Sequence, residues 1–142
     1  MVLTALIALI NLTIEAINPG AQWTLQRLFG LLMAPLAWLI GVPGSEAQTV
    51  GSLLGTKTVL NEYLAYLDLI QLAPGVLSPR SQLLATYALC SFANLGSLGI
   101  MIGGLGTLCP NRRSEIIQLG YRCVFGGTLA TLSGAALIGV IY

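Results

Sequence analysis

Three polar side chains stand close together in the run GTKTVLNEYLAY, residues 55–66: Lys57, Asn61 and Glu62. The surrounding chain is apolar, since 56% of its residues are hydrophobic and only 8% are charged. Ionisable groups are costly to bury in such a setting, so Glu62 is expected to have a specific role. It either accepts hydrogen bonds from a hydroxylated solute, or forms a structural ion pair with Lys57, or carries a charge at a helix end. Lys57 in turn either supports this segment or neutralises Glu62.

A second polar group follows in the run FANLGS. Asn94 and Ser97 are three residues apart, so they share a face wherever the backbone is helical. Both side chains donate and accept hydrogen bonds, which suits sugar hydroxyls better than a purely anionic group. The alternative is that they join neighbouring membrane helices by hydrogen bonds. Phe92 either stacks on a ligand or packs in the core.

The residue types exclude several other chemistries. The chain has no histidine, so it cannot build a histidine-based triad or an imidazole relay. Its three cysteines, Cys90, Cys109 and Cys123, form no CxxC pair, which excludes a zinc site of ordinary spacing. Arg112 and Arg113 are the only adjacent basic pair, which is too little for nucleic-acid binding. We therefore expect no catalytic residue, no metal ligand and no enzyme activity.

The overall composition predicts a membrane protein of one domain. The chain has 142 residues, with six basic and five acidic residues and a formal net charge of +1. Its mean hydropathy is +0.86. Soluble proteins carry about a quarter charged residues, and this chain has too few to cover a soluble globule of its size. A lipid bilayer is the solvent that this composition fits.

Apolar runs and helix-breaking residues divide the chain into five predicted segments. These are the end of a membrane helix at 1–18, an interfacial or packed helix at 22–42, a helical hairpin at 45–72, a broken transmembrane helix at 81–108 and a final transmembrane helix at 114–142. Each arm of the hairpin is too short to cross a bilayer alone, so the hairpin is expected to enter and leave on the same side. The fold class is therefore predicted to be all-α.

Within these segments we expect Ser45 to be the N-cap of the hairpin and its tip to lie near Gly55 to Thr58. The broken helix should be interrupted near Asn94, because poor helix formers follow it. The glycines at 99, 103, 104 and 106 are expected to be sites of close helix packing. A hairpin and a broken helix both expose backbone polar groups at membrane depth, where they must be buried in protein or face water. Such an arrangement is typical of the binding sites of secondary transporters.

Four motifs taken together resemble the C-terminal region of the concentrative nucleoside transporter family. They are GTKTVLNEYLAY, SPRSQLLATYALCSFANLGSLGIMIGGLG, CPNRRSEI and GGTLATL, and the similarity runs from about residue 5 to the end of the chain. The resemblance implies a homotrimeric symporter of the inner or plasma membrane that imports nucleosides with a sodium or proton gradient. It also implies that this chain is one half of an inverted-repeat transport domain.

The resemblance assigns roles to the polar residues. Glu62, Asn94 and Ser97 match the positions that hold the ribose in the family, and Phe92 matches the aromatic residue beside the ribose. Lys57 and Asn61 match neighbouring positions of the hairpin and are expected to support the site. The polar cluster of the hairpin is then half of a sugar-binding site.

Some parts of the family pattern are absent from this sequence. They are the hairpin that reads the nucleobase, with its G-Q-T-E type motif, the first broken helix and most of the trimerisation scaffold. We therefore expect the chain to be the C-terminal part of a transporter, to bind no cofactor itself and to need the missing N-terminal half as a partner. Three alternatives remain: a non-transporting membrane assembly subunit, a truncated and inactive fragment, or a carrier for another polar solute.

Overall fold

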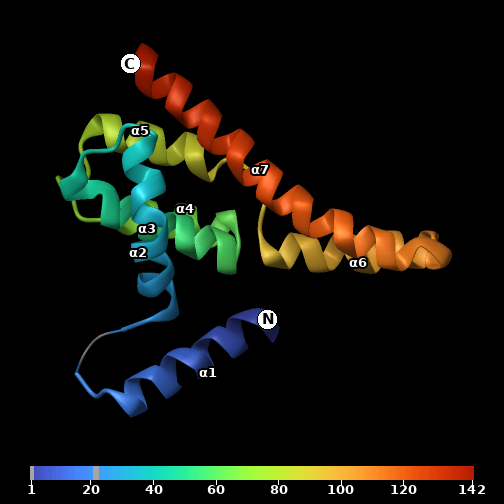
Figure 1. Ribbon diagram of the computed structural model, residues 1–142. Coiled ribbons are helices and arrows are strands. Elements are labelled where there is room, and N and C mark those ends of the chain that lie inside the picture. The colour runs from blue at the N-terminus through green and yellow to red at the C-terminus, as the bar shows by residue number, and fades with distance from the viewer. Residues whose placement is uncertain (1, 21–22) are drawn as a thin grey trace.

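The computed structural model describes residues 2–20 and 23–142, and its architecture is all-α (Figure 1). No strand occurs in these two ranges. The helices are α1 (Val2–Ile17), α2 (Leu25–Leu39), α3 (Gly44–Val59), α4 (Glu62–Gln71), α5 (Pro79–Leu89), α6 (Leu95–Leu108), the short 3₁₀ helix η1 (Pro110–Arg112) and α7 (Arg113–Ile141).

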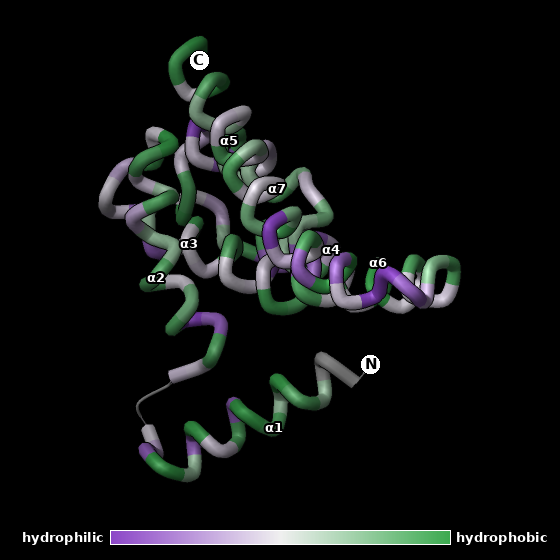
Figure 2. Tube along the Cα trace, turned by 45° about the vertical axis from the view of Figure 1, so that its right-hand side comes forward, coloured by the Kyte–Doolittle hydropathy of each residue, from purple (hydrophilic) through white to green (hydrophobic). Residues whose placement is uncertain are grey.

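The hydrophobic core lies among α2, α3, α5 and the C-terminal half of α7. Its completely buried side chains include Val50 of α3, Leu84 of α5 and Ala135 of α7. The helix α6 and the first half of α7 extend away from this core side by side, and α1 lies apart, below the other helices in the view of Figure 1. Hydrophobic residues predominate along α1 (Figure 2), which is joined to α2 by polar contacts of Asn11.

Glycines let α2 and α3 approach each other closely. A Cβ added to Gly51 would lie 2.5 Å from the Gly30 carbonyl oxygen, and one added to Gly55 would lie 3.0 Å from the Phe29 Cβ. Gly55 is therefore a helix-contact residue within α3 and not part of a turn. The predicted hairpin tip near Gly55 to Thr58 is wrong, because α3 continues through these residues to Val59.

The turn between α3 and α4 lies at Leu60 and Asn61 instead. Leu60 leaves the helical region with φ −102° and ψ −92°. Asn61 is extended and caps α4, since its side-chain oxygen accepts a 2.9 Å hydrogen bond from the Leu64 N–H. At the other end of α3 the expected Ser45 cap is also wrong. Pro43 holds the N-cap position, and its carbonyl accepts the free N–H groups of the first turn.

The long helix predicted at 81–108 is interrupted at residues 90–94, here called the break. The helix α5 ends at Leu89 with Cys90 as its C-cap, and α6 begins at Leu95 with Asn94 as its N-cap. The non-helical trace of the break is visible between α5 and α6 in Figure 1. The predicted interruption near Asn94 is therefore confirmed.

The glycines of α6 do not serve as packing sites within the described part of the chain. A Cβ added to Gly99, Gly103 or Gly104 would meet no described atom within 4 Å, and one added to Gly106 would meet only the Arg113 side chain. Close packing at these glycines is therefore not seen among the described residues, and packing against further parts of a longer protein stays a prediction. The contact between α6 and α7 is made elsewhere, where Leu98 packs over Gly120.

One stretch among the described residues, Pro110–Ile141, is a helix long and apolar enough to cross a membrane. It has 32 residues, and 11% of its most apolar window is buried inside the molecule. Shorter apolar helical stretches occupy Ala5–Ile17, Leu25–Leu39 and Leu95–Leu108. Most of the apolar surface of α7 is thus left for lipid or for other protein to cover.

Candidate functional site

The start of α4 and the break meet through one hydrogen bond. The Asn94 side-chain amide donates to the Glu62 carboxylate at 2.8 Å, across 32 residues of sequence. Asn94 is completely buried, whereas Glu62 is half-buried. A hydrogen bond to a charged group is among the stronger ones in proteins. The sequence therefore brings its two polar groups together in space.

Asn94 also ties the break to Ser97. Its side-chain oxygen accepts a 2.7 Å hydrogen bond from the Ser97 backbone N–H, which caps α6. The two residues are neighbours because of this cap and not because both lie on a regular helical face, since Asn94 has extended backbone angles. The half-buried Ser97 hydroxyl makes no hydrogen bond within residues 2–20 and 23–142 and stays available to a ligand.

Lys57 lies beside the break but is not paired with Glu62. It is 2% exposed, and its ammonium donates to the Ala88 carbonyl at 2.8 Å and to the Ser91 hydroxyl at 2.9 Å. No ion pair joins Lys57 to Glu62 in the described structure; the Arg112–Glu115 pair lies elsewhere, on the surface. The alternative of a structural Lys57–Glu62 ion pair is therefore wrong.

Ser91 is a site residue that the sequence reasoning missed. It lies in the break, three residues before Asn94, and is the only side chain that accepts a hydrogen bond from Lys57 in the described structure. The signal in the sequence was the hydroxyl itself, which interrupts the apolar run before Phe92. Nothing local connected it to a lysine 34 residues away.

Asn61 supports Glu62 directly. It is the N-cap of α4, and Glu62 is the first residue of that helix. The cap fixes where α4 begins, and a carboxylate in the first turn is favoured by the positive end of the helix dipole. The Glu62 side chain is therefore held at a defined place beside the break.

Phe92 lies in the break and is 76% exposed. With Ser91 and Ser97 it borders an open hollow of about 400 Å³. The other residues that line this hollow come from the break, α6 and α7: Ala93, Leu98, Met101, Gly120, Cys123, Val124 and Gly127. Phe92 is thus not packed in the core that the described residues form, and its ring is free to meet a ligand or another part of the protein.

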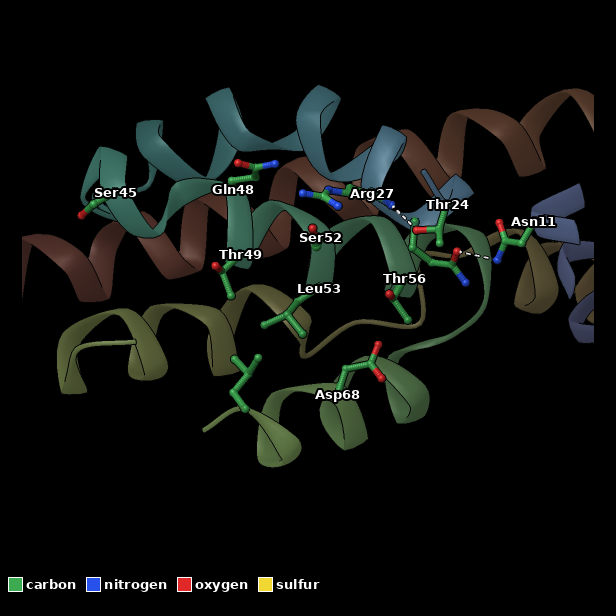
Figure 3. Close-up of a pocket in the computed structure, with 12 residues that line it drawn as sticks. Asn11, Thr24, Arg27, Ser45, Gln48, Thr49, Ser52, Leu53, Thr56 and Asp68 are labelled. Carbon is green, nitrogen blue, oxygen red and sulfur yellow. Dashed lines mark hydrogen bonds between the residues drawn. The ribbon is translucent and has the colours of Figure 1, made fainter. Parts of the chain in front are cut away.

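A larger hollow, of about 670 Å³, lies elsewhere (Figure 3). Its lining includes polar side chains of α3, among them Gln48, Thr49 and Ser52, and Asp68 of α4 (Figure 3). None of Glu62, Asn94, Ser97 and Phe92 lines it. Size alone therefore does not mark the site, and the convergence of Glu62, Asn94 and Ser97 carries more weight.

The chemistry of these groups is that of binding. The site offers a carboxylate, an amide and a hydroxyl, all able to bond hydroxyl groups. No group of three or more His, Cys, Asp or Glu side chains is placed to hold a metal ion in the described ranges. The arrangement suits a polyhydroxylated, uncharged ligand such as a sugar.

The chain is similar to a family of known transporters along almost its whole length. A family model described as "Na+ dependent nucleoside transporter C-terminus" matches residues 1–139. An uncharacterized transporter of Haemophilus influenzae is 43% identical over 143 residues, which are 95% of this chain and 34% of that protein. The human sodium/nucleoside cotransporter 1 is 33% identical over 153 residues, which are 91% of this chain and 24% of that protein.

A solved structure is equally similar. The chain matches CNTnw in an inward-facing substrate-bound state with a TM-score of 0.84 and 44% identity, covering 96% of this chain and 33% of that one. The chain therefore spans about a third or less of the length of the proteins it matches.

Proposed function

The chain belongs to the family of Na+-dependent nucleoside transporters, whose C-terminal region it matches, and on this premise we propose that it is part of an ion-coupled nucleoside symporter. It is a membrane protein of a multi-pass transporter family and not an enzyme. Its own part in the proposed symporter is the ribose-binding half of the nucleoside site. The observation that carries this proposal is the meeting of Glu62 with Asn94 beside Ser97.

The geometry supports a grip on ribose hydroxyls. The Glu62 carboxylate has one oxygen bonded to Asn94 and a second oxygen with no hydrogen-bond partner among the described residues. A hydroxyl that donates to this second oxygen and accepts from the Ser97 hydroxyl would satisfy both groups. Phe92, exposed at the edge of the same region, offers an apolar surface to a ring of the ligand.

The rest of the transporter is proposed from the relatives. Names such as sodium/nucleoside cotransporter favour sodium as the coupling ion, with the proton as the other candidate. The ion and the nucleobase are assigned to the N-terminal part of the transporter, which these relatives have and the match does not cover. The complete assembly is proposed to be a homotrimer in the lipid bilayer of the cell membrane.

Glu62→Gln in the complete transporter tests this proposal. Glutamine keeps the shape of the side chain but removes its charge. The ribose hydroxyl and the Asn94 amide, which donate to residue 62, then lose a charged acceptor. We expect the KM for radiolabelled uridine uptake to rise at least about tenfold, since a hydrogen bond to a charged group is worth about 1.5–3 kcal/mol. Uptake is measured in proteoliposomes with an imposed ion gradient.

The matched control is Glu115→Gln. Glu115 is an exposed carboxylate paired with Arg112 at the start of α7, and an exposed ion pair contributes little. This variant should transport uridine like the wild type. If Glu62→Gln is equally silent, the ribose role is refuted and the assembly subunit becomes the better reading. If another polar solute competes with uridine better than nucleosides do, the chain serves a different carrier.

A further inference from the structure

Lys57 is a buried cation whose surroundings explain why it is tolerated. It is the single lysine of the chain and is 2% exposed. A buried charge is costly unless it is hydrogen-bonded to groups that match it. Its two acceptors, the Ala88 carbonyl and the Ser91 hydroxyl, lie 31 and 34 residues further along the chain. Lys57 therefore joins α3 to the upstream side of the break.

The position of Ala88 makes its contact with the Lys57 ammonium electrostatically favourable. Ala88 lies in the last turn of α5, where the carbonyls lack helical partners and the helix dipole is negative. An ammonium group at this place satisfies a free carbonyl and neutralises the end of the helix. Ser91, just past the end of α5, is held by the same group.

The second arm of the hairpin, α4, makes a contact of the opposite charge. Glu62, in the first turn of α4, accepts a hydrogen bond from Asn94, the N-cap of α6. The N-terminal end of a helix is the positive end of its dipole, and a carboxylate is favoured beside it. The hairpin thus places a cation at the end of α5 and an anion at the start of α6.

We propose that Lys57 is a positioning residue for sugar binding. This inference rests on the proposed function. Lys57 and Glu62 together form a clamp on the break, in which Lys57 holds Ala88 and Ser91 and Glu62 holds Asn94. Lys57 touches no ligand in this account. By fixing the upstream side of a short non-helical segment, it sets where Phe92 and Asn94 stand relative to Ser97.

The first test is hydrogen exchange on the complete transporter without nucleoside, comparing Lys57→Met with the wild type. Methionine fills a similar space but donates no hydrogen bond. Amides of residues 88–94 should exchange about tenfold faster or more, because a charged hydrogen bond is lost there. Amides of α2 should be unchanged. Unchanged exchange at 88–94, or an equal increase in α2, would overturn the proposal.

Ser91→Ala is a milder variant that is matched to Lys57→Met. It removes one acceptor of the ammonium and leaves the Ala88 carbonyl in place. We expect faster exchange at the break, with a smaller increase than in Lys57→Met. An increase as large as that in Lys57→Met would overturn the proposal, because Ala88 would then contribute nothing.

The second test is selectivity in uptake, which a general loss of folded protein would not change. In Lys57→Met the KM for uridine should rise about tenfold, whereas the KM for 2′,3′-dideoxyuridine, which lacks both ring hydroxyls, should rise much less. An equal rise for both would overturn a positioning role toward the sugar. The exchange test uses no nucleoside, so failure of the proposed function in Glu62→Gln leaves the clamp separately testable.

Discussion

Two interruptions of the helical backbone, the α3–α4 turn and the break, both use asparagine but in different ways. Asn61 restarts the helix after the α3–α4 turn, and Asn94 restarts it after the break. Each side-chain oxygen accepts the backbone N–H three residues later, at 2.9 Å for Asn61 and 2.7 Å for Asn94. Asn94 also donates its amide to Glu62 and is completely buried, whereas Asn61 is half-buried and makes no such tertiary bond among the described residues.

The cap made by Asn61 is a local contact only, whereas Asn94 makes a local cap and a tertiary contact. The oxygen of an asparagine cap stabilises the helix that follows it and needs nothing else. The amide group of Asn94 performs a second task, since it holds the Glu62 carboxylate against the break. Matched substitutions at the two asparagines therefore measure what the second task adds.

The largest effect is expected for Asn94→Asp. Aspartate keeps the cap on α6, but it replaces the amide donor with a carboxylate facing that of Glu62, and like charges at this distance repel. We expect the free energy of unfolding to fall by about 3–5 kcal/mol, the range for an uncompensated buried charge. Thermal unfolding of the complete transporter in detergent checks this.

Asn61→Asp is its control. Aspartate is as good a cap as asparagine and is favoured at the positive end of a helix, so stability should change by less than about 0.5 kcal/mol. If both variants change the free energy of unfolding by the same amount, the Glu62–Asn94 contact contributes nothing to stability, and the proposed difference between the two asparagines is refuted.

Asn94→Ala should have the next largest effect. It removes the cap, worth about 1 kcal/mol, and the donor to Glu62 without adding a charge. A loss of about 2 kcal/mol is expected in the same unfolding measurement, together with a higher KM for uridine. The double variant with Glu62→Gln should lose less than the sum of the single variants, because both substitutions act on the same contact. Strict additivity would show that the two residues act independently.

The general architecture of the chain could be predicted from its sequence. Mean hydropathy indicated a membrane protein, and the poor helix formers around Asn94 located the break. The resemblance to the C-terminal region of nucleoside transporters is confirmed by the family match over residues 1–139. These features follow from composition, local propensity and motif order, which a linear sequence contains.

The errors concern contacts between distant residues. Gly55 was expected near a turn, but it meets Phe29 of α2, and no local pattern distinguishes a glycine that turns from one that packs. Gly103 was expected to pack and meets nothing within 4 Å among the described residues, so its expected partner stays a prediction. The partners of Lys57 were missed for the same reason, because Ala88 contributes a backbone carbonyl that any residue would supply. The ligand roles of Glu62, Asn94, Ser97 and Phe92 stay predictions.

The smallest effect is expected for Asn61→Ala, which removes only a local cap. The loss should be about 1 kcal/mol, since alanine cannot accept the Leu64 N–H and that group must turn to water or stay unpaired. Asn61→Ser, which restores a capping oxygen, should recover most of this loss in the same unfolding experiment. Because Glu62 begins α4, fraying of the first turn should also weaken uridine binding slightly. A loss as large as that of Asn94→Ala would mean that Asn61, too, holds more than its own helix.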